Sequence, residues 1–345
     1  MNSTLLISIF FTSLIGIYIL IKYAYKLRLV DIPNKRSMHK KVTPRGAGIA
    51  FVLSVFVVVL LFDFEHFKTY YYIYLAITIV FIVGAWDDLK NISPKIKFLF
   101  IFFSSLLLYV NDFAIYSLGT YFGYEVVLPV WFVFPFTFFA IAGYTNALNL
   151  MDGLDGLAAS IAIVILVTFL AIGIEYGDEL LITLSSFFTV TLLAFLLFNW
   201  NPAKIFMGDS GSLSLGIVIA ILAIHAIEYI TPASVLFVIA MPILDTFIVM
   251  TRRIQRNISP FKADKNHMHH FLFNVKGDIR YTVIILVLMQ MVFSIIGYQL
   301  DPSNEFLSLL LFMILFYLYL NLFDQRLKRR KSYGKIETYT KEDSK

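Results

Sequence analysis

Five short polar segments, each lying between apolar runs, hold nearly all of the residues in this chain that could do chemistry. The first, residues 31–48 (DIPNKRSMHKKVTPRGAG), contains two prolines that exclude regular helix and two glycines that allow a ligand to approach the backbone closely. Its positive charge would suit any cytoplasmic loop, but the proline and glycine positions need a further reason. The basic and histidine side chains here are Lys35, Arg36, His39, Lys40, Lys41 and Arg45.

The second segment begins with the adjacent carboxylates Asp87 and Asp88, and Lys90, Lys95 and Lys97 follow it. Neighbouring carboxylates repel each other, and the repulsion is poorly screened at a membrane edge. Such a pair persists where a cation or a lysine neutralises it. A solvated helix end is the alternative interpretation, and the two acids alone do not decide between them.

The third segment, residues 146–157 (NALNLMDGLDGL), repeats polar side chains at three-residue spacing in Asn149, Asp152 and Asp155. That spacing puts them on one side of a helix or tight turn. No basic residue in the segment offsets the two acids. An EF-hand loop is excluded, because it needs a longer series of ligands that ends in Glu.

The fourth segment, residues 199–213, starts at Asn199 and places Asp209 among glycines and serines just before an apolar run. Helix capping would explain Asp209 and one serine. Free N–H groups at a glycine-rich helix start also bind phosphate, and the two uses are compatible. The segment is not a Walker A loop, because the GK[ST] ending is missing.

The fifth segment, residues 252–270, carries Arg256 and three of the six histidines, His267, His269 and His270. A zinc site is the obvious alternative, but the pattern lacks the Glu of a His-Glu-x-x-His helix and any Cys. These side chains suit anionic oxygens instead. The histidines at 66 and 225 are interpreted as structural.

Asp245 lies inside an apolar run, close to the fifth segment. A carboxylate within a membrane costs about 2.5–3.5 kcal/mol on insertion scales and less near the interface, so it needs a partner. We expect Arg252, Arg253 or a bound cation to serve.

The segments are positioned by about eleven apolar runs, in a chain of 345 residues that is 59% hydrophobic and 15% charged. This composition excludes a disordered chain, a coiled coil and almost any soluble fold. It predicts an all-α polytopic integral membrane protein. A hairpin is expected at 112–129. The runs lie near 3–21, 46–62, 70–86, 98–110, 130–147, 157–174, 180–198, 213–229, 233–251, 282–299 and 306–323.

The basic residues predict the orientation of these helices. If the runs alternate across the membrane, 27 of the 28 Lys and Arg residues fall on one side, which is therefore cytoplasmic. The N-terminus is then outside and the C-terminus inside. We expect one transmembrane catalytic domain, 1–325, and a basic cytoplasmic tail, 326–345, that faces anionic lipids. The positive charge needs no nucleic acid.

Aspartates gathered beside lysines, arginines and histidines fit a hard divalent cation, most simply Mg²⁺, that bridges protein oxygens and substrate phosphates. Because the cluster lies at the inner membrane edge, one substrate can arrive from the cytosol and the other from the bilayer. Phosphoryl transfer to a lipid phosphate is the chemistry that needs both.

These five segments resemble the polyprenyl-phosphate N-acetylhexosamine-1-phosphate transferases, which include the first enzymes of wall teichoic acid and enterobacterial-antigen lipid synthesis. The phospho-MurNAc-pentapeptide transferase is a more distant relative. The matching segments span nearly the whole chain in the family's order. Two small departures are Gly46-Ala-Gly48, where a Gly-Gly pair is common, and Asn257, where a Gly often precedes Ser-Pro-Phe.

The resemblance implies that a UDP-N-acetylhexosamine and undecaprenyl phosphate give undecaprenyl-diphospho-sugar and UMP, the first step of a cell-envelope glycan. It implies an Mg²⁺-dependent phosphoglycosyltransferase of the bacterial plasma membrane, with Mn²⁺ as a substitute metal and an active site that faces the cytoplasm. UDP-GlcNAc is the default donor. Another UDP-amino sugar and a homodimer both stay open.

The resemblance also implies roles for individual residues. Asp209 is the expected Mg²⁺ ligand, with Asp152 beside it. Asp87 positions or deprotonates the acceptor phosphate, and Asp88 holds Lys95 or Lys97. The nucleotide is contacted, or its pocket shaped, by Asn149, Asp152, Asp155 and Asn199, and the diphosphate is bound by Lys41, Arg256, His269 and His270, with His267 close by.

Two other classes of protein share this composition. A secondary transporter or lipid flippase would place its acids near the bilayer midplane, often within internal repeats, whereas here only Asp245 is within a span. A structural scaffold would not need six acids opposite a cationic cluster.

Overall fold

The computed structural model describes residues 3–33, 41–255, 257, 259, 267–300 and 302–321, and this part of the chain is almost entirely helical. Two short antiparallel pairs, β1 (Val30–Asp31) with β2 (Thr43–Pro44) and β3 (Ser117–Tyr121) with β4 (Tyr124–Val127), are its strands. The helices are α1 (Ser3–Leu27), α2 (Ala47–Phe62), α3 (Phe64–Thr69), α4 (Tyr71–Lys90), α5 (Pro94–Tyr109), α6 (Val130–Met151), α7 (Leu157–Tyr176), α8 (Glu179–Asn199), α9 (Asp209–Ala226), α10 (Pro232–Val238), α11 (Ala240–Gln255), α12 (Met268–Lys276), α13 (Ile279–Gln299), the 3₁₀ turn η1 (Pro302–Asn304) and a last helix, Glu305–Asn321.

The all-α polytopic prediction is confirmed, because each of the eleven apolar runs contains a helix. Within the described residues, seven helices are long and apolar enough to cross a membrane, and a bent pair brings the number to eight. The helices α2, α5 and Glu305–Asn321 are shorter. Sixteen residues extend about 24 Å, against a hydrocarbon core of about 30 Å. Eleven spans and their orientation therefore stay a prediction.

The run at 233–251 does not form the single span that we expected. It breaks at Ile239, where α10 and α11 meet at 87°. The buried amide of Gln290 in α13 donates to Val238 O at 2.7 Å and accepts the N–H of Met241 at 3.0 Å. Since a membrane offers no water to bond such groups, this side chain permits the break.

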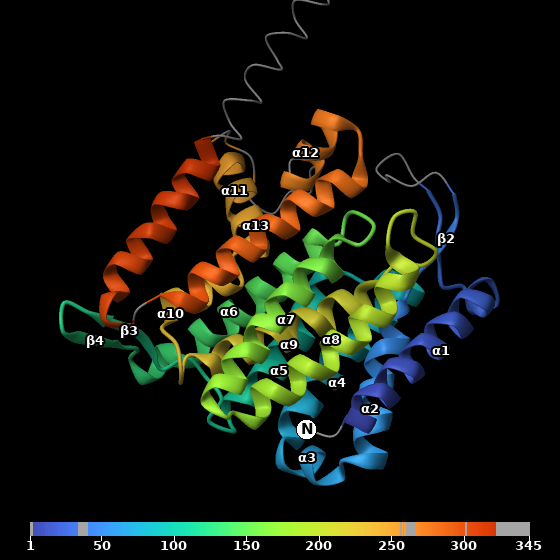
Figure 1. Ribbon diagram of the computed structural model, residues 1–345, viewed down its shortest axis with the longest axis horizontal. Helices are drawn as coiled ribbons and strands as arrows, with labels where there is room; N and C mark the ends of the chain where they lie inside the picture. The colour runs from blue at the N-terminus through green and yellow to red at the C-terminus, as the bar shows by residue number, and fades with distance from the viewer. Residues whose placement is uncertain are drawn as a thin grey trace, which may run out of the picture.

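The helix α9 forms the centre of the bundle and packs against α2, α4, α6, α7 and α8 (Figure 1). The helix α2 approaches α9 so closely that only glycine fits at their contact. A Cβ on Gly48, near the start of α2, would lie 2.0 Å from the backbone nitrogen of Gly211. The start of α9 is therefore held tightly against α2.

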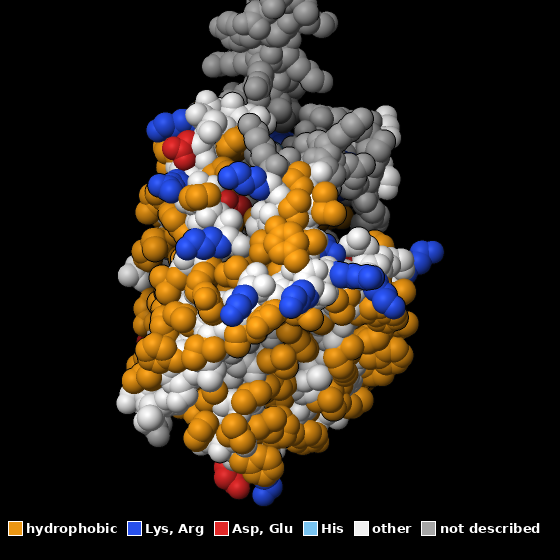
Figure 2. All heavy atoms as spheres, turned by 90° about the vertical axis from the view of Figure 1, so that its right-hand side faces the viewer, with side chains coloured by type: hydrophobic (Ala, Val, Ile, Leu, Met, Phe, Trp, Pro, Cys, Tyr) orange, Lys and Arg blue, Asp and Glu red, His pale blue; other side chains and the backbone are white. Residues whose placement is uncertain are grey.

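The polar segments gather at one end of the bundle. Figure 1 shows β2, α12 and the connections between α6 and α7 and between α8 and α9 at this end, and α3 and the β3–β4 hairpin at the other. The hairpin that we expected at 112–129 is confirmed. Figure 2 shows Lys and Arg side chains across one face above a largely apolar surface, as for a protein whose lower part lies in hydrocarbon.

Candidate active site

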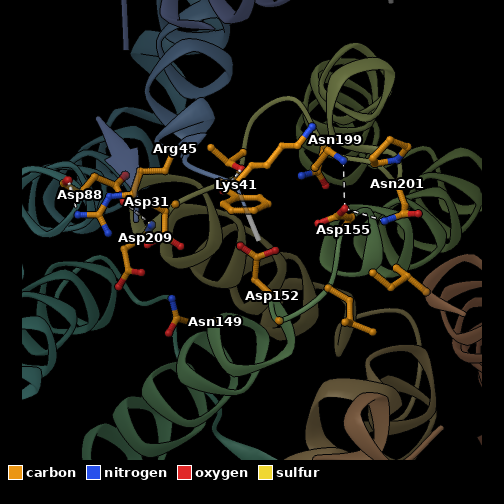
Figure 3. A pocket seen from close by; sticks show the side chains of 18 of the residues that line it. Asp31, Lys41, Arg45, Asp88, Asn149, Asp152, Asp155, Asn199, Asn201 and Asp209 are labelled. Atoms are coloured by element: carbon orange, nitrogen blue, oxygen red, sulfur yellow. Dashed lines mark hydrogen bonds between the residues drawn. The ribbon is translucent and has the colours of Figure 1, made fainter. Parts of the chain in front are cut away.

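One cavity of about 670 Å³ lies between the polar segments (Figure 3). This volume is in the range of sites for small-molecule ligands, about 300–1,000 Å³. Segments that are far apart in the sequence meet here. The predicted site residues that line it are Lys41, Asp88, Asn149, Asp152, Asp155, Asn199, Asp209 and His270.

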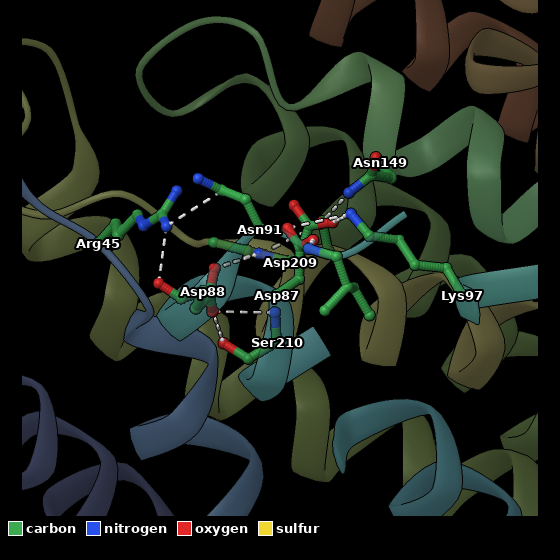
Figure 4. Close-up of polar contacts among 11 residues, drawn as sticks. Arg45, Asp87, Asp88, Asn91, Lys97, Asn149, Asp209 and Ser210 are labelled. Atoms are coloured by element: carbon green, nitrogen blue, oxygen red, sulfur yellow. Dashed lines mark hydrogen bonds and ion pairs between the residues drawn. The ribbon is translucent and has the colours of Figure 1, made fainter. Parts of the chain in front are cut away.

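Asp88 and Asp209 line one end of the cavity, and Asp87 and Lys97 lie beside them without lining it. These four residues are here called the acidic end (Figure 4). The carboxylate of Asp88 accepts the backbone N–H groups of Asp209 at 2.9 Å and Ser210 at 3.1 Å, and the Ser210 hydroxyl at 2.5 Å. Asp88 thus satisfies free N–H groups at the start of α9, as a capping residue does. It fixes the position of Asp209.

Lys97 reaches the acidic end from α5 and bonds to Asp209 and, at 3.0 Å, to Asp87. Our expectation that Asp88 holds a lysine is wrong, because consecutive helical residues point in different directions and only Asp87 faces Lys97. The other oxygen of Asp87 accepts Ile92 N–H at 2.8 Å. Lys95 is exposed and does not line the cavity.

The side chains of Asn149 and Asp152 lie between the acidic end and the opposite wall (Figure 3). The amide of Asn149 donates to Ser212 Oγ at 2.7 Å. Asp152 bonds to no other side chain in the described part of the chain. Burial, together with the negative charges of Asp209, Asp88 and Asp155, raises the pKa of Asp152 to about 7. A cation in the cavity would relieve this.

The opposite end, here called the amide end, is formed by Asp155, Asn199 and Asn201. One oxygen of Asp155 accepts the amide of Asn201 at 2.8 Å and the N–H of Ala203 at 3.0 Å. Asn199 bonds at 2.9 Å to Gly156 N–H and to the Ile205 carbonyl. Both ends of the Asn199 amide are therefore bonded to backbone groups of the cavity wall.

The three histidines of the fifth segment occupy different environments. His267 Nδ1 lies 2.7 Å from a carboxylate oxygen of Asp245, whose other oxygen accepts Met268 N–H at 2.6 Å. The partner of Asp245 is therefore the start of α12, not Arg252 or Arg253 as we expected. His270 lines the cavity.

His269 is buried and does not line the cavity, although we expected it to bind diphosphate. Its ring lies against Gly153, where an added Cβ would be 2.6 Å from Nε2. Burial lowers its pKa to about 3 against the opposing charge of Asp245, so the ring is neutral at physiological pH. Of the described histidines in this segment, His270 alone lines the cavity. Arg256 lies outside the described residues, as does the tail at 326–345.

Comparison with known proteins gives the family of the chain. A family model described as glycosyl transferase family 4 matches residues 70–227. The chain is 34% identical over 299 residues to a probable undecaprenyl-phosphate N-acetylglucosaminyl 1-phosphate transferase of Bacillus subtilis, covering 85% of this chain and 83% of that protein. It belongs to this transferase family. The resemblance inferred from the motifs is confirmed.

Two further relatives carry the name undecaprenyl-phosphate alpha-N-acetylglucosaminyl 1-phosphate transferase. The protein of Yersinia pestis is 32% identical over 335 residues, covering 92% of this chain and 90% of its own. The protein of Escherichia coli is 30% identical over 333 residues, covering 92% and 89%. The similarity to these transferases therefore includes all five polar segments.

The donor set of this transferase chain suits Mg²⁺ better than a metal that needs many protein ligands. Within the described residues, no three His, Cys, Asp or Glu side chains converge on one point. Mg²⁺ is usually held by one or two carboxylates with waters and substrate phosphates. Among the described lining residues there are five aspartates but only two permanent cations, Lys41 and Arg45. Asp209 and Asp152 fit such a site.

The transferase cavity also contains residues to which the sequence interpretation gave no individual role: Asp31, Arg45, Asn201 and Phe206. Arg45 donates to the Asp88 carbonyl at 2.7 Å and Asn201 to Asp155. These contacts join segments far apart in the chain, and the one from Arg45 goes to a backbone atom, so residue spacing gives no sign of them. The repeated Asn-x-Asn of 199–201 was the available signal.

Proposed function

We propose that this chain transfers GlcNAc-1-phosphate from UDP-GlcNAc to undecaprenyl phosphate, releasing UMP. The observation that carries the proposal is the single cavity in which Asp209, Asp152 and Asp155 meet, in a chain whose relatives bear this activity in their names. An oxygen of the lipid phosphate attacks the sugar-bearing phosphorus. A P–O bond to the lipid forms and the P–O bond to UMP breaks.

The acidic end is where this chemistry takes place. A phosphate monoester has a second pKa near 6, so most of the acceptor is ionised at pH 7. Asp87 positions the acceptor or removes its remaining proton, and Lys97, bonded to Asp87 and Asp209, holds both carboxylates in place. Asp88 keeps Asp209 at the start of α9.

Two anionic substrates meet in a cavity that is itself acidic, so cations are required. We propose Asp209 and Asp152 as the residues that hold Mg²⁺, which supplies positive charge to the phosphoryl oxygens. Lys41 and His270 line the same cavity and bind the diphosphate. We also keep the proposal, made from the sequence, that Arg256 binds the diphosphate.

The remaining proposals concern the donor and the location. The amide end, with Asp155 and Asn199 shaping it, receives the donor, and Asn149 contacts the nucleotide. UDP-GlcNAc is preferred over other UDP-amino sugars because the relatives are named for N-acetylglucosamine. The asymmetry of Lys and Arg supports an active site on the cytoplasmic side of a bacterial plasma membrane.

The test is the reaction itself. Purified protein in detergent is incubated with Mg²⁺, undecaprenyl phosphate and each of a panel of UDP-sugars, and released UMP is measured. UMP should appear with UDP-GlcNAc and depend on the lipid phosphate and on Mg²⁺. Asp209→Asn is the inactive control. No UMP with any donor would refute the proposal, and lipid transport without UMP would favour a transporter.

A further inference from the structure

Arg280, in the first turn of α13, holds a backbone carbonyl of the segment between α8 and α9. Its Nε and Nη2 groups donate to Asn201 O at 3.0 and 2.7 Å. Two N–H groups from one planar guanidinium on one oxygen fix both direction and distance. The contact ties α13 to a segment 79 residues earlier in the chain.

The segment that Arg280 holds is a wall of the amide end. Asn201, Pro202 and Ala203 all line the cavity, as does Ile279, the neighbour of Arg280. On the inner side, Asp155 accepts from the Asn201 amide and the Ala203 N–H. The wall is thus held from inside by Asp155 and from outside by Arg280.

A basic residue at the cytoplasmic end of a span often serves only topology. That role does not need a particular partner atom. Arg280 is exposed, and within the described part of the chain it forms no ion pair. Its bonds go to one carbonyl of the cavity wall, which indicates a local task.

We propose that Arg280 is a positioning residue for the nucleotide-sugar donor. It holds residues 201–203 so that the amide end keeps the shape that the donor requires. The inference rests on the transferase function proposed above. Because the acidic end performs the transfer, the amide end receives the part of the donor that is remote from the reacting phosphorus. Loss of Arg280 therefore weakens donor binding and spares the acceptor.

The kinetic test compares Arg280→Ala and Arg280→Lys with Lys276→Ala. Lys276 is an exposed cation near the same helix junction, 4.0 Å from the centre of the Tyr281 ring, and it does not line the cavity. Arg280→Ala should raise the donor KM roughly 3- to 30-fold, as expected for losing hydrogen bonds from a charged group. The acceptor KM and kcat should stay within about twofold. Arg280→Lys should be intermediate, because an ammonium lacks the two-pronged geometry.

A second readout does not depend on turnover. Hydrogen–deuterium exchange of the peptide containing 199–206 should be faster in Arg280→Ala and unchanged in Lys276→Ala. If the wild-type chain releases no UMP, the proposed function fails. The exchange measurement still tests whether Arg280 holds residues 201–203 in place. Unchanged exchange with unchanged donor KM in Arg280→Ala overturns the inference. A fall in kcat at constant donor KM also overturns it.

Discussion

The carboxylate of Asp88 accepts the backbone N–H of Asp209 at 2.9 Å, so an acid of α4 fixes the first residue of α9. Both oxygens of the buried Asp88 are occupied by donors from Asp209 and Ser210. The adjacent acids at 87 and 88 thus have separate tasks. Asp87 faces Lys97, and Asp88 holds the helix that carries the proposed metal ligand.

Asp88→Asn should therefore impair both stability and turnover. The NH₂ group of the asparagine would face an N–H donor of Asp209 or Ser210. A buried donor left without a partner lowers the free energy of unfolding by about 1–3 kcal/mol. Displacement of Asp209 should lower the rate of UMP release by about 100-fold. Ser210→Ala is the control, since it keeps both backbone bonds and should lose much less. A wild-type rate in Asp88→Asn would contradict this role.

Substitution of Lys97 and of Lys95 should have different effects on the rate of UMP release. Lys97→Ala removes the cation between Asp87 and Asp209. One bond to a charged group is worth about 1.5–3 kcal/mol, so the rate should fall by at least roughly 10- to 100-fold. Lys95→Ala changes an exposed side chain and should stay within about twofold. Steady-state UMP release measures both, and equal losses in the two variants would contradict the structure.

Gln290→Leu should destabilise the break between α10 and α11. It leaves the Met241 N–H without a partner inside the bundle, at about 1–3 kcal/mol, and leaves the Val238 carbonyl with only the Ser294 hydroxyl at 3.5 Å. Gln299→Leu makes the same change at an exposed position of α13 and should have little effect. Thermal unfolding in detergent compares the two. Equal unfolding temperatures would show that the break does not need Gln290.

His66 should make stability depend on pH. It is buried between Thr183 Oγ1 at 2.7 Å and Tyr74 OH at 3.1 Å, and burial lowers its pKa below 6.5 against the charges of Asp63 and Glu179. The unfolded chain then binds this proton more readily, so stability falls as pH drops through about 6.5. In His66→Gln the loss of unfolding temperature between about pH 7.5 and pH 5.5 should be smaller. An equal or larger loss would refute this.

Much of the fold was predictable because the bilayer imposes length and composition on each span. The eleven apolar runs all contain helices, and the spacing of Asn149, Asp152 and Asp155 does direct them toward one cavity. The break at Ile239 had one signal in its own run, Pro242, which has no N–H to bond to the Val238 carbonyl four residues earlier. The side chain that satisfies the backbone at the break, Gln290, lies about fifty residues later, and a lone Gln in an apolar helix does not reveal its partners.

The pairing of charges was harder to predict than their location. We expected Asp245 to bond to Arg252 or Arg253 of the same helix or to a bound cation, but it bonds to His267 at the start of α12. Asp87 and Asp88 look equivalent in sequence, yet consecutive residues of a helix point about 100° apart, so the two acids contact different neighbours. Arg280 and Asn201 meet through a backbone carbonyl, which no pattern of side-chain types encodes.

The enclosure of α9 has a consequence for the environment in which the protein works. In its most apolar stretch 89% of the residues are buried, against 22% in α1. The chain itself therefore leaves most of α1 uncovered, whereas it encloses the helix that begins with Asp209. Changing the acyl-chain length of the surrounding lipids should alter how the acceptor reaches the cavity, while the geometry around Asp209 stays constant.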